Sequence, residues 1–130
     1  MTIRSTLLIA AAGLAVLAAG CGENPDDVAK SWHAAILRGD LGKANRCVVA
    51  TPEAKLGNEM WAKIISDLRK RSDADPEAKK ALRKAEHAKF SPPEIAGDHA
   101  TIRFSLEGED KPVQLGFQKL DGKWKIADIK

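Results

Sequence analysis

The chain has 130 residues, with 21 Lys or Arg, 18 Asp or Glu and two Cys. Apart from Arg4, which lies in a predicted leader, 20 basic residues stand against 18 acidic ones. Such an even balance does not indicate nucleic-acid binding. The 110 residues after position 20 have the size of one ordinary domain.

The N-terminal segment predicts an export signal. Arg4 and the amino terminus supply positive charge, and thirteen apolar residues follow from Leu7 to Ala19. A membrane-spanning helix needs about 20 such residues, whereas the apolar region of a secretory signal has roughly 7 to 15. We therefore expect residues 1–20 to be a signal peptide, residues 21–24 a short tether and residues 25–130 a single domain.

The segment Ala18-Ala19-Gly20-Cys21 resembles the lipobox of bacterial lipoproteins, in which the Cys takes a diacylglyceryl thioether. This resemblance implies lipid attachment at Cys21 and a place on a membrane of the cell envelope. Gly22, rather than Asp, follows the Cys, so the expected membrane is the outer one, on its periplasmic side, where a host has two. A plain signal peptide with an incidental Cys is the alternative. With Cys21 lipidated, Cys47 would have no disulfide partner, and we interpret Cys47 as a small buried hydrophobe.

The first half of the mature chain predicts helices. Asn24-Pro25, Thr51-Pro52 and Asp75-Pro76 each place a capping side chain before a Pro at the first helical position. Gly39 ends the first helix, and Asp40 can cap a short one. Apolar residues recur at helical spacing, first at Val28, Trp32, Ala35 and Ile36, then at Leu56, Met60, Ile64 and Leu68, beside Trp61 and Ile65.

The second half predicts strands, because apolar residues alternate with polar ones over 100–106 and 113–118. Asp121-Gly122 is a favoured hairpin turn before a last strand over 123–126. An earlier strand over 88–95 is interrupted by Pro92-Pro93. Helices followed by strands indicate an α+β domain, with helices on one face of a curved antiparallel sheet of about four strands. The expected core is Trp32, Ile36, Met60, Ile64, Phe104, Leu115, Phe117, Trp124 and Ile126.

Two motifs carry a family resemblance. The pattern P-x-x-V-A-x-x-W-x-x-A-I-x-x-G-D-x-x-x-A over 25–44 and D-G-K-W-K-I over 121–126 resemble small bacterial lipoproteins of the nuclear-transport-factor-2-like superfamily. They resemble its lumazine-binding-like domains of unknown function in particular. The resemblance implies a cone with a pocket at its open end. That superfamily includes isomerases, dehydratases and binding modules, so the fold alone selects no function.

The candidate catalytic residues are few. Enzymes of that superfamily place an Asp or His base in the cone, several with an opposing Tyr, and this chain has no Tyr. His33 and Asp128 could point inward and act on a hydrophobic substrate, as in an isomerase or dehydratase. His33 is equally explained by the edge of an apolar helix face, and Asp128 by the solvated end of a strand. No motif for a metal or a cofactor is present, so we expect neither.

Two interpretations of function follow. In the first, the domain is a non-catalytic, membrane-anchored module that binds a small apolar ligand or an envelope protein. In the second, it is the cone enzyme described above. The segment 69–89 has eight basic and four acidic residues, which makes it either a solvated face or a surface that lies on lipid headgroups. The residues assigned to this basic patch are Lys79, Lys80, Arg83 and Lys84.

Overall fold

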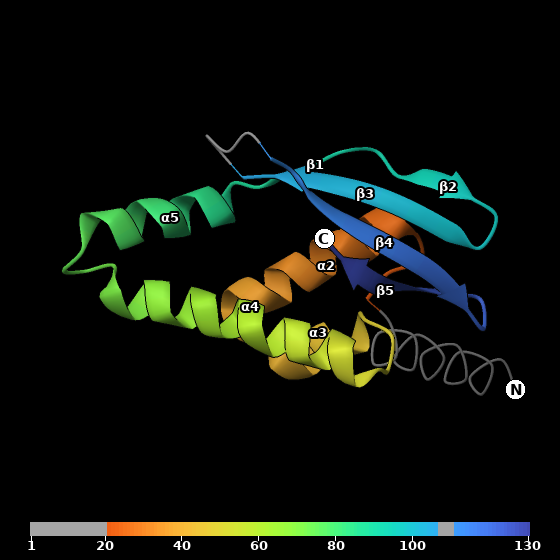
Figure 1. The fold of residues 1–130 in the computed structure, drawn as a ribbon, viewed down its shortest axis with the longest axis horizontal. Coiled ribbons are helices and arrows are strands. Elements are labelled where there is room, and N and C mark those ends of the chain that lie inside the picture. The colour runs from red at the N-terminus through yellow and green to blue at the C-terminus, as the bar shows by residue number, and fades with distance from the viewer. Residues whose placement is uncertain (1–20, 107–110) are drawn as a thin grey trace, which may run out of the picture.

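The computed structural model describes residues 21–106 and 111–130, so the predicted signal peptide lies outside the described residues (Figure 1). The helices are α2 (Pro25–Arg38), α3 (Leu41–Arg46), α4 (Pro52–Arg71) and α5 (Pro76–Glu86). The strands are β1 (Lys89–Phe90), β2 (Glu94–Ala96), β3 (His99–Ser105), β4 (Val113–Leu120) and β5 (Lys123–Ile129). In these described ranges, no helix combines the length and apolar character that crossing a membrane requires.

The predicted caps open the three longer helices. The side chains of Asn24, Thr51 and Asp75 accept hydrogen bonds from backbone N–H groups in the first turns of α2, α4 and α5. Gly39 ends α2 in the left-handed conformation (φ 75°), and its N–H donates to the carbonyls of Ala35 and Ile36. Glycine adopts this conformation at little steric cost, so the chain can turn here into α3.

The sheet is antiparallel and open. Its strands run in the order β1-β3-β4-β5, and β2 also pairs with β3. The single strand expected over 88–95 is divided into β1 and β2 around Pro92-Pro93, because Pro cannot donate to a strand ladder. The α+β class is confirmed, whereas the sheet does not close and the expected cone is not confirmed.

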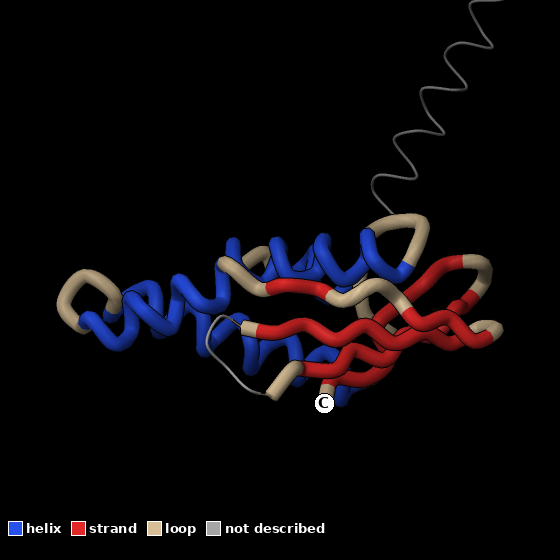
Figure 2. Tube along the Cα trace, turned by 90° about the horizontal axis from the view of Figure 1, so that it is seen from above, coloured by secondary structure: helices blue, strands red, loops and turns tan. Residues whose placement is uncertain are grey.

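Helices and sheet divide the molecule into two regions. α2 packs against β3 and β5, and the sheet covers one of its faces. α4 runs past α2 and α3 and forms a hairpin with α5, which extends beyond the end of the sheet (Figures 1 and 2). The α4–α5 turn forms one end of the long axis, and the start of α2 lies in the opposite half of the molecule (Figure 1).

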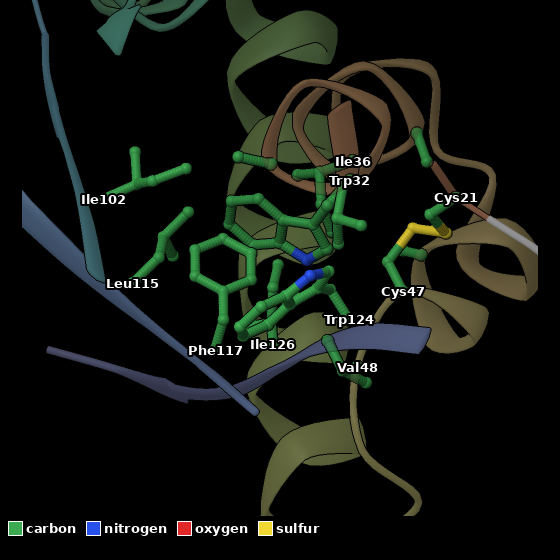
Figure 3. Packing of buried hydrophobic residues seen from close by; sticks show 14 of the residues in the cluster. Cys21, Trp32, Ile36, Cys47, Val48, Ile102, Leu115, Phe117, Trp124 and Ile126 are labelled. Carbon is green, nitrogen blue, oxygen red and sulfur yellow. A yellow bond between two sulfur atoms is a disulfide. The ribbon is translucent and has the colours of Figure 1, made fainter. Parts of the chain in front are cut away.

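The core lies between α2 and the sheet (Figure 3). It buries seven of the predicted core residues, namely Trp32, Ile36, Phe104, Leu115, Phe117, Trp124 and Ile126. Trp32 packs on Phe104, with ring centroids 6.2 Å apart, and its indole N–H donates to Asn58 Oδ1 at 2.7 Å. Asn58 is fully buried, and its amide donates to Asn45 Oδ1 at 3.1 Å. This polar chain joins α2, α3 and α4.

The prediction that Met60 and Ile64 belong to the core is wrong, since their side chains are 58% and 49% exposed. The side of α4 that faces the core carries a different row of residues, at heptad spacing. These residues are Ala54, Asn58, Trp61, Ile65 and Leu68. That row contains a polar residue whose amide is satisfied only by side chains on α2 and α3. The sequence prediction placed the more apolar row of α4 in the core, whereas the structure places that row on the surface.

The two cysteines form a disulfide, with Cα atoms 5.4 Å apart, at the edge of the core (Figure 3). Cys47, which we expect to have no partner where Cys21 is lipidated, is bonded to Cys21 in this structure. Cys47 ends α3, and its carbonyl accepts a hydrogen bond from the N–H of Ile126 at 2.8 Å. The disulfide thus connects the residues before α2 to a segment that runs along β5.

Candidate functional site

An apolar groove lies between α4 and α5. It has a volume of about 230 Å³. Its apolar lining comes from Trp61, Ile64, Ile65 and Leu68 on α4, Ala81 and Ala85 on α5, and Leu106 after β3. The charged residues that line it are Glu77, Lys80 and Lys84, all from α5.

The sequence of α5 explains why the groove is not filled. Ala78, Ala81 and Ala85 recur at helical spacing on the side that approaches α4, and Ala78 is buried. Small side chains let the two helices approach each other, but they are too short to fill the groove between the helices. The larger side chains of α4, Trp61 and Leu68, are consequently only partly buried.

An exposed apolar row continues from the groove along α4. Met60 and Leu56 (57% exposed) lie one and two helical turns before Ile64, which lines the groove with Leu68. Residues four apart form a ridge on a helix surface, and ridges of this kind pack against other helices. We call Leu56, Met60 and Ile64 the apolar ridge. Scattered exposed apolar residues are ordinary, whereas a contiguous set marks a surface for interaction.

Charged residues border the apolar ridge on both sides. On the α5 side, Lys80 is exposed and Lys84 is half-buried at the groove. On the other side, the next row of α4 alternates in charge and consists of Lys55, Glu59, Lys63, Asp67 and Arg71. Asp67 is also paired with Arg71 at 3.1 Å. Basic residues therefore outnumber acidic ones by one on each side.

The predicted basic patch is divided by this geometry. Lys80 and Lys84 line the groove, whereas Lys79 and Arg83 do not. All four are on α5, at the end of the molecule away from the start of α2 (Figure 1). For a membrane to touch both the patch and the residues near Cys21, the long axis of the domain would have to lie along the bilayer.

His33 lies at the joint between α2 and α5. Its Nε2 is 2.8 Å from the carbonyl oxygen of Ala85, and its ring packs on Phe90 and Phe104. A carbonyl only accepts, so Nε2 carries the hydrogen and donates. Burial lowers the pKa of the imidazole from its ordinary value, and the Ala85 hydrogen bond raises it by less. His33 lines a narrow cavity of about 20 Å³ beside the groove.

Asp128 lines a different cavity, of about 210 Å³, between the start of α4 and β5. Glu53 is the other carboxylate there, and Lys130 pairs with Asp128 at 3.4 Å. None of the residues around His33 belongs to this cavity. The structure therefore does not bring the two candidate catalytic residues together.

A metal site is not formed in the described part of the chain, where no group of three or more His, Cys, Asp or Glu side chains could hold an ion. Sequence reasoning missed both the groove and the buried Asn58. The signal available for the groove was the spacing of Ala78, Ala81 and Ala85, which indicates close helix approach without filling. For Asn58, the signal was the heptad spacing from Ala54 to Leu68, but a polar residue within that row is not typical of a helix face that packs on a core.

No family model matches the chain, and no curated protein matches it. Two solved structures are similar in fold. One is the solution structure of a SEC-C motif containing protein from Rhodopseudomonas palustris, with TM-score 0.52 and 15% identity, covering 83% of this chain and 78% of that one. The other is the crystal structure of the type VI effector–immunity complex Tae3–Tai3 from Ralstonia pickettii, with TM-score 0.50 and 17% identity, covering 84% and 95%.

These neighbours correct the family resemblance drawn from the sequence motifs. Neither is a nuclear-transport-factor-2-like lipoprotein domain, and that assignment is wrong. The motifs over 25–44 and 121–126 correspond to the capped α2 with its Gly39 stop and to the β4–β5 hairpin. Such local features recur on many α+β folds. At 15% and 17% identity the two similarities show the fold alone.

Proposed function

We propose that the chain is exported to the bacterial cell envelope and acts there as a non-catalytic module that binds a protein partner. The observation that carries the proposal is the apolar ridge on α4, where Leu56, Met60 and Ile64 are about half exposed in a continuous row. Burying such a ridge against a partner removes apolar surface from water, at about 25 cal/mol per Å².

The shape of the surface favours a protein over a small apolar ligand. The groove measures about 230 Å³ and opens onto the ridge. Cavities that enclose small ligands hold roughly 300 to 1,000 Å³ and bury most of the ligand. The neighbour from an effector–immunity complex is itself a protein found with a partner, which is in keeping with this proposal.

The absence of a catalytic role is supported by the surroundings of the two candidates. The Nε2 of His33 is engaged by the Ala85 carbonyl, and Asp128 lines a separate cavity beside Lys130. A general base acts together with its catalytic partner in one site, and these two residues line separate cavities.

Export is supported by the leader and by the disulfide, since disulfides persist in oxidising compartments such as the periplasm. The lipid anchor proposed at Cys21 competes with this disulfide, because one sulfur cannot hold both a thioether and a disulfide. In the anchored form Cys47 is a buried thiol, and the acyl chains hold the protein on the membrane. In the disulfide form Cys47 keeps its partner, and the domain is released after signal cleavage.

The test is carried out on the full chain expressed in a bacterium. Intact mass of the purified protein distinguishes a diacylglyceryl adduct from a disulfide. A photo-crosslinking residue at Met60, compared with one at Leu120 on the sheet, then reports whether the α4 face is occupied in the envelope. We expect one defined protein adduct at position 60 and none at position 120. Equal labelling at the two positions, or none at either, contradicts the proposed function.

A further inference from the structure

We propose that Arg46, Lys123 and Lys125 form a contact surface for the anionic phospholipid headgroups of the membrane to which Cys21 anchors the chain. We call these three basic residues the α3–β5 cluster. The inference rests on the anchored form in the proposed function. It adds the face that the domain turns towards the bilayer.

Backbone pairing brings the three residues together from distant parts of the chain. Cys47 follows Arg46, and its carbonyl accepts a hydrogen bond from the N–H of Ile126 at 2.8 Å. The ammonium group of Lys125 donates to the carbonyl oxygen of Arg46. Lys123 is two residues before Lys125 on β5, so the two side chains leave the strand on the same face. Arg46 and Lys123 are exposed, and Lys125 is half-buried. The end of α3 and the start of β5 therefore present one positively charged surface.

The positive charges of the α3–β5 cluster repel one another. Burial lowers the pKa of Lys125 from its ordinary value, and the charges of Lys123 and Arg46 lower it further. Among the described residues, no acidic side chain forms an ion pair with any of the three. An anion at this surface would relieve the repulsion, because a nearby opposite charge favours the charged form of an amine.

The flanking segments carry charge of both signs. Their basic residues are Lys43 and Lys119, and their acidic residues are Glu23, Asp40, Asp98 and Asp121. The side chain of Asp40 accepts from the N–H of Lys43 at the start of α3, whereas Arg46 is the last residue of that helix. Segments 41–46 and 123–127 contain four basic residues and no acidic one. The excess of positive charge is therefore located at the cluster itself.

The α3–β5 cluster lies beside the anchor residue. Cys21 Sγ is 3.7 Å from the carbonyl oxygen of Lys43, and the Cα atoms of Cys21 and Cys47 are 5.4 Å apart. In the anchored form, residues 22–24 alone separate Cys21 from α2, and they span about 10 Å when extended. Attraction between basic side chains and an anionic bilayer acts over about 8 Å at physiological ionic strength. Acyl chains on Cys21 would thus bring the cluster to the headgroups.

The basic patch on α5 is the alternative membrane contact. It belongs to the hairpin whose turn lies at the other end of the long axis from the β4–β5 turn (Figure 1). Contact through that patch requires the long axis to lie along the bilayer, whereas contact through the α3–β5 cluster does not. The cluster also leaves the α4–α5 hairpin open to the protein partner proposed above.

The test uses the lipidated protein as purified from the bacterium. It is inserted into vesicles of phosphatidylcholine or of a phosphatidylcholine–phosphatidylglycerol mixture. A water-soluble acetylating reagent labels exposed amines, and mass spectrometry gives the labelling rate of each Lys. We expect phosphatidylglycerol to slow the labelling of Lys123 by about threefold or more, and that of Lys79 and Lys80 by less. Added salt should remove this protection, because it screens the charges.

A matched pair of variants locates the contact. Arg46→Gln should reduce the protection of Lys123 by about twofold, because it removes one of the three charges. The labelled amine is unchanged, and the carbonyl of residue 46 can still accept from Lys125. Arg83→Gln removes an equally exposed arginine from α5 and should leave the protection of Lys123 unchanged. Circular dichroism confirms that both variants are folded.

Several results would overturn the inference. These are equal labelling of Lys123 in the two kinds of vesicle, protection that salt leaves unchanged, or equal protection in Arg46→Gln and the wild type. Protection of Lys79 and Lys80 alone assigns the membrane contact to the α5 patch. Protection of Lys123 by soluble polyglutamate, but not by the vesicles, assigns the cluster to an acidic protein.

The outcomes also separate this inference from the proposed function. Failure at Lys123 in lipidated protein leaves the anchor and the partner surface on α4 in place. Purified protein that carries only the disulfide removes the anchored form, and this contact with it, while the crosslink at Met60 still reports on the partner.

Discussion

α2 and α4 carry the same sequence pattern, apolar residues four apart after a capped Pro, yet the structure uses them in opposite ways. The apolar row of α2 is buried, and Trp32 is 1% exposed. The corresponding row of α4 faces outward, while a second row with Asn58 at its centre faces α2. The sheet covers α2, whereas nothing in the described chain covers the far side of α4. An amphipathic pattern thus predicts an interface without identifying what completes it.

The largest effect expected is the loss of a core aromatic. Trp124→Ala should lower the free energy of unfolding by about 3–5 kcal/mol, because Trp124 is buried in the region between α2 and the sheet. Met60→Ala should change it by less than about 0.5 kcal/mol, since exposed positions are tolerant. Urea unfolding of both variants measures the contrast. Similar losses in the two would contradict the division into a covered and an uncovered row.

The second effect concerns the disulfide between Cys21 and Cys47. Cys47→Ala should cost about 3 kcal/mol in protein that carries the disulfide, because the bond closes a loop with a sequence separation of 26. In lipidated protein the same substitution removes only a small buried side chain and should cost about 1 kcal/mol. Thermal unfolding with and without dithiothreitol separates these cases. A melting temperature that dithiothreitol leaves unchanged shows that the disulfide is absent from the purified protein.

The third effect compares two neighbouring residues on α4. Asn58→Ala should cost about 1–3 kcal/mol, because it leaves the buried indole N–H of Trp32 without an acceptor. Gly57→Ala should instead stabilise the protein by about 0.5–1 kcal/mol, since an added Cβ meets no atom within 4 Å and alanine favours a helix. Denaturant midpoints of the two variants provide the measurement. A destabilising Gly57→Ala would indicate that this face of α4 is packed after all.

The smallest effect is a pH dependence at the joint between the two regions. Burial lowers the pKa of His33 in the folded protein, so the unfolded chain binds the proton more readily. The contribution of His33 to the free energy of unfolding should be fully present above pH of about 6.5, the pKa in the unfolded chain. It should be lost as pH falls through the lower pKa of the folded protein. His33→Gln keeps a donor for the Ala85 carbonyl and should remove this part of the dependence. The check is the difference between wild-type and variant melting temperatures across pH 4 to 8; a difference that stays constant would disprove the effect.

Much of the fold could be predicted from local chemistry. The caps at Asn24, Thr51 and Asp75, the Gly39 stop and the Asp121-Gly122 turn each act within a few residues, so their consequences are visible in sequence. Alternation over β3 and β4 likewise reports which face of the sheet is covered.

The candidate site depended on relations between distant residues. Which row of α4 turns inward is decided by Trp32, 26 positions away, whose indole satisfies Asn58. The partner of Cys47 is likewise 26 positions away, and an interpretation that assigned Cys21 to a lipid removed it from consideration. The environment of His33 depends on Ala85, 52 positions along the chain. No local pattern contains these pairings.

Gly22 gives the disulfide a requirement of its own. Its backbone has φ 155°, and a Cβ placed there would overlap the side chain and backbone of Asp27. Only glycine therefore allows Cys21 to dock beside Cys47. In the lipidated form proposed above, the same residue would also determine the destination membrane. Gly22→Asp would therefore act on two different forms of the protein: on sorting in lipidated protein, and on the position of Cys21 beside Cys47 in disulfide-bonded protein.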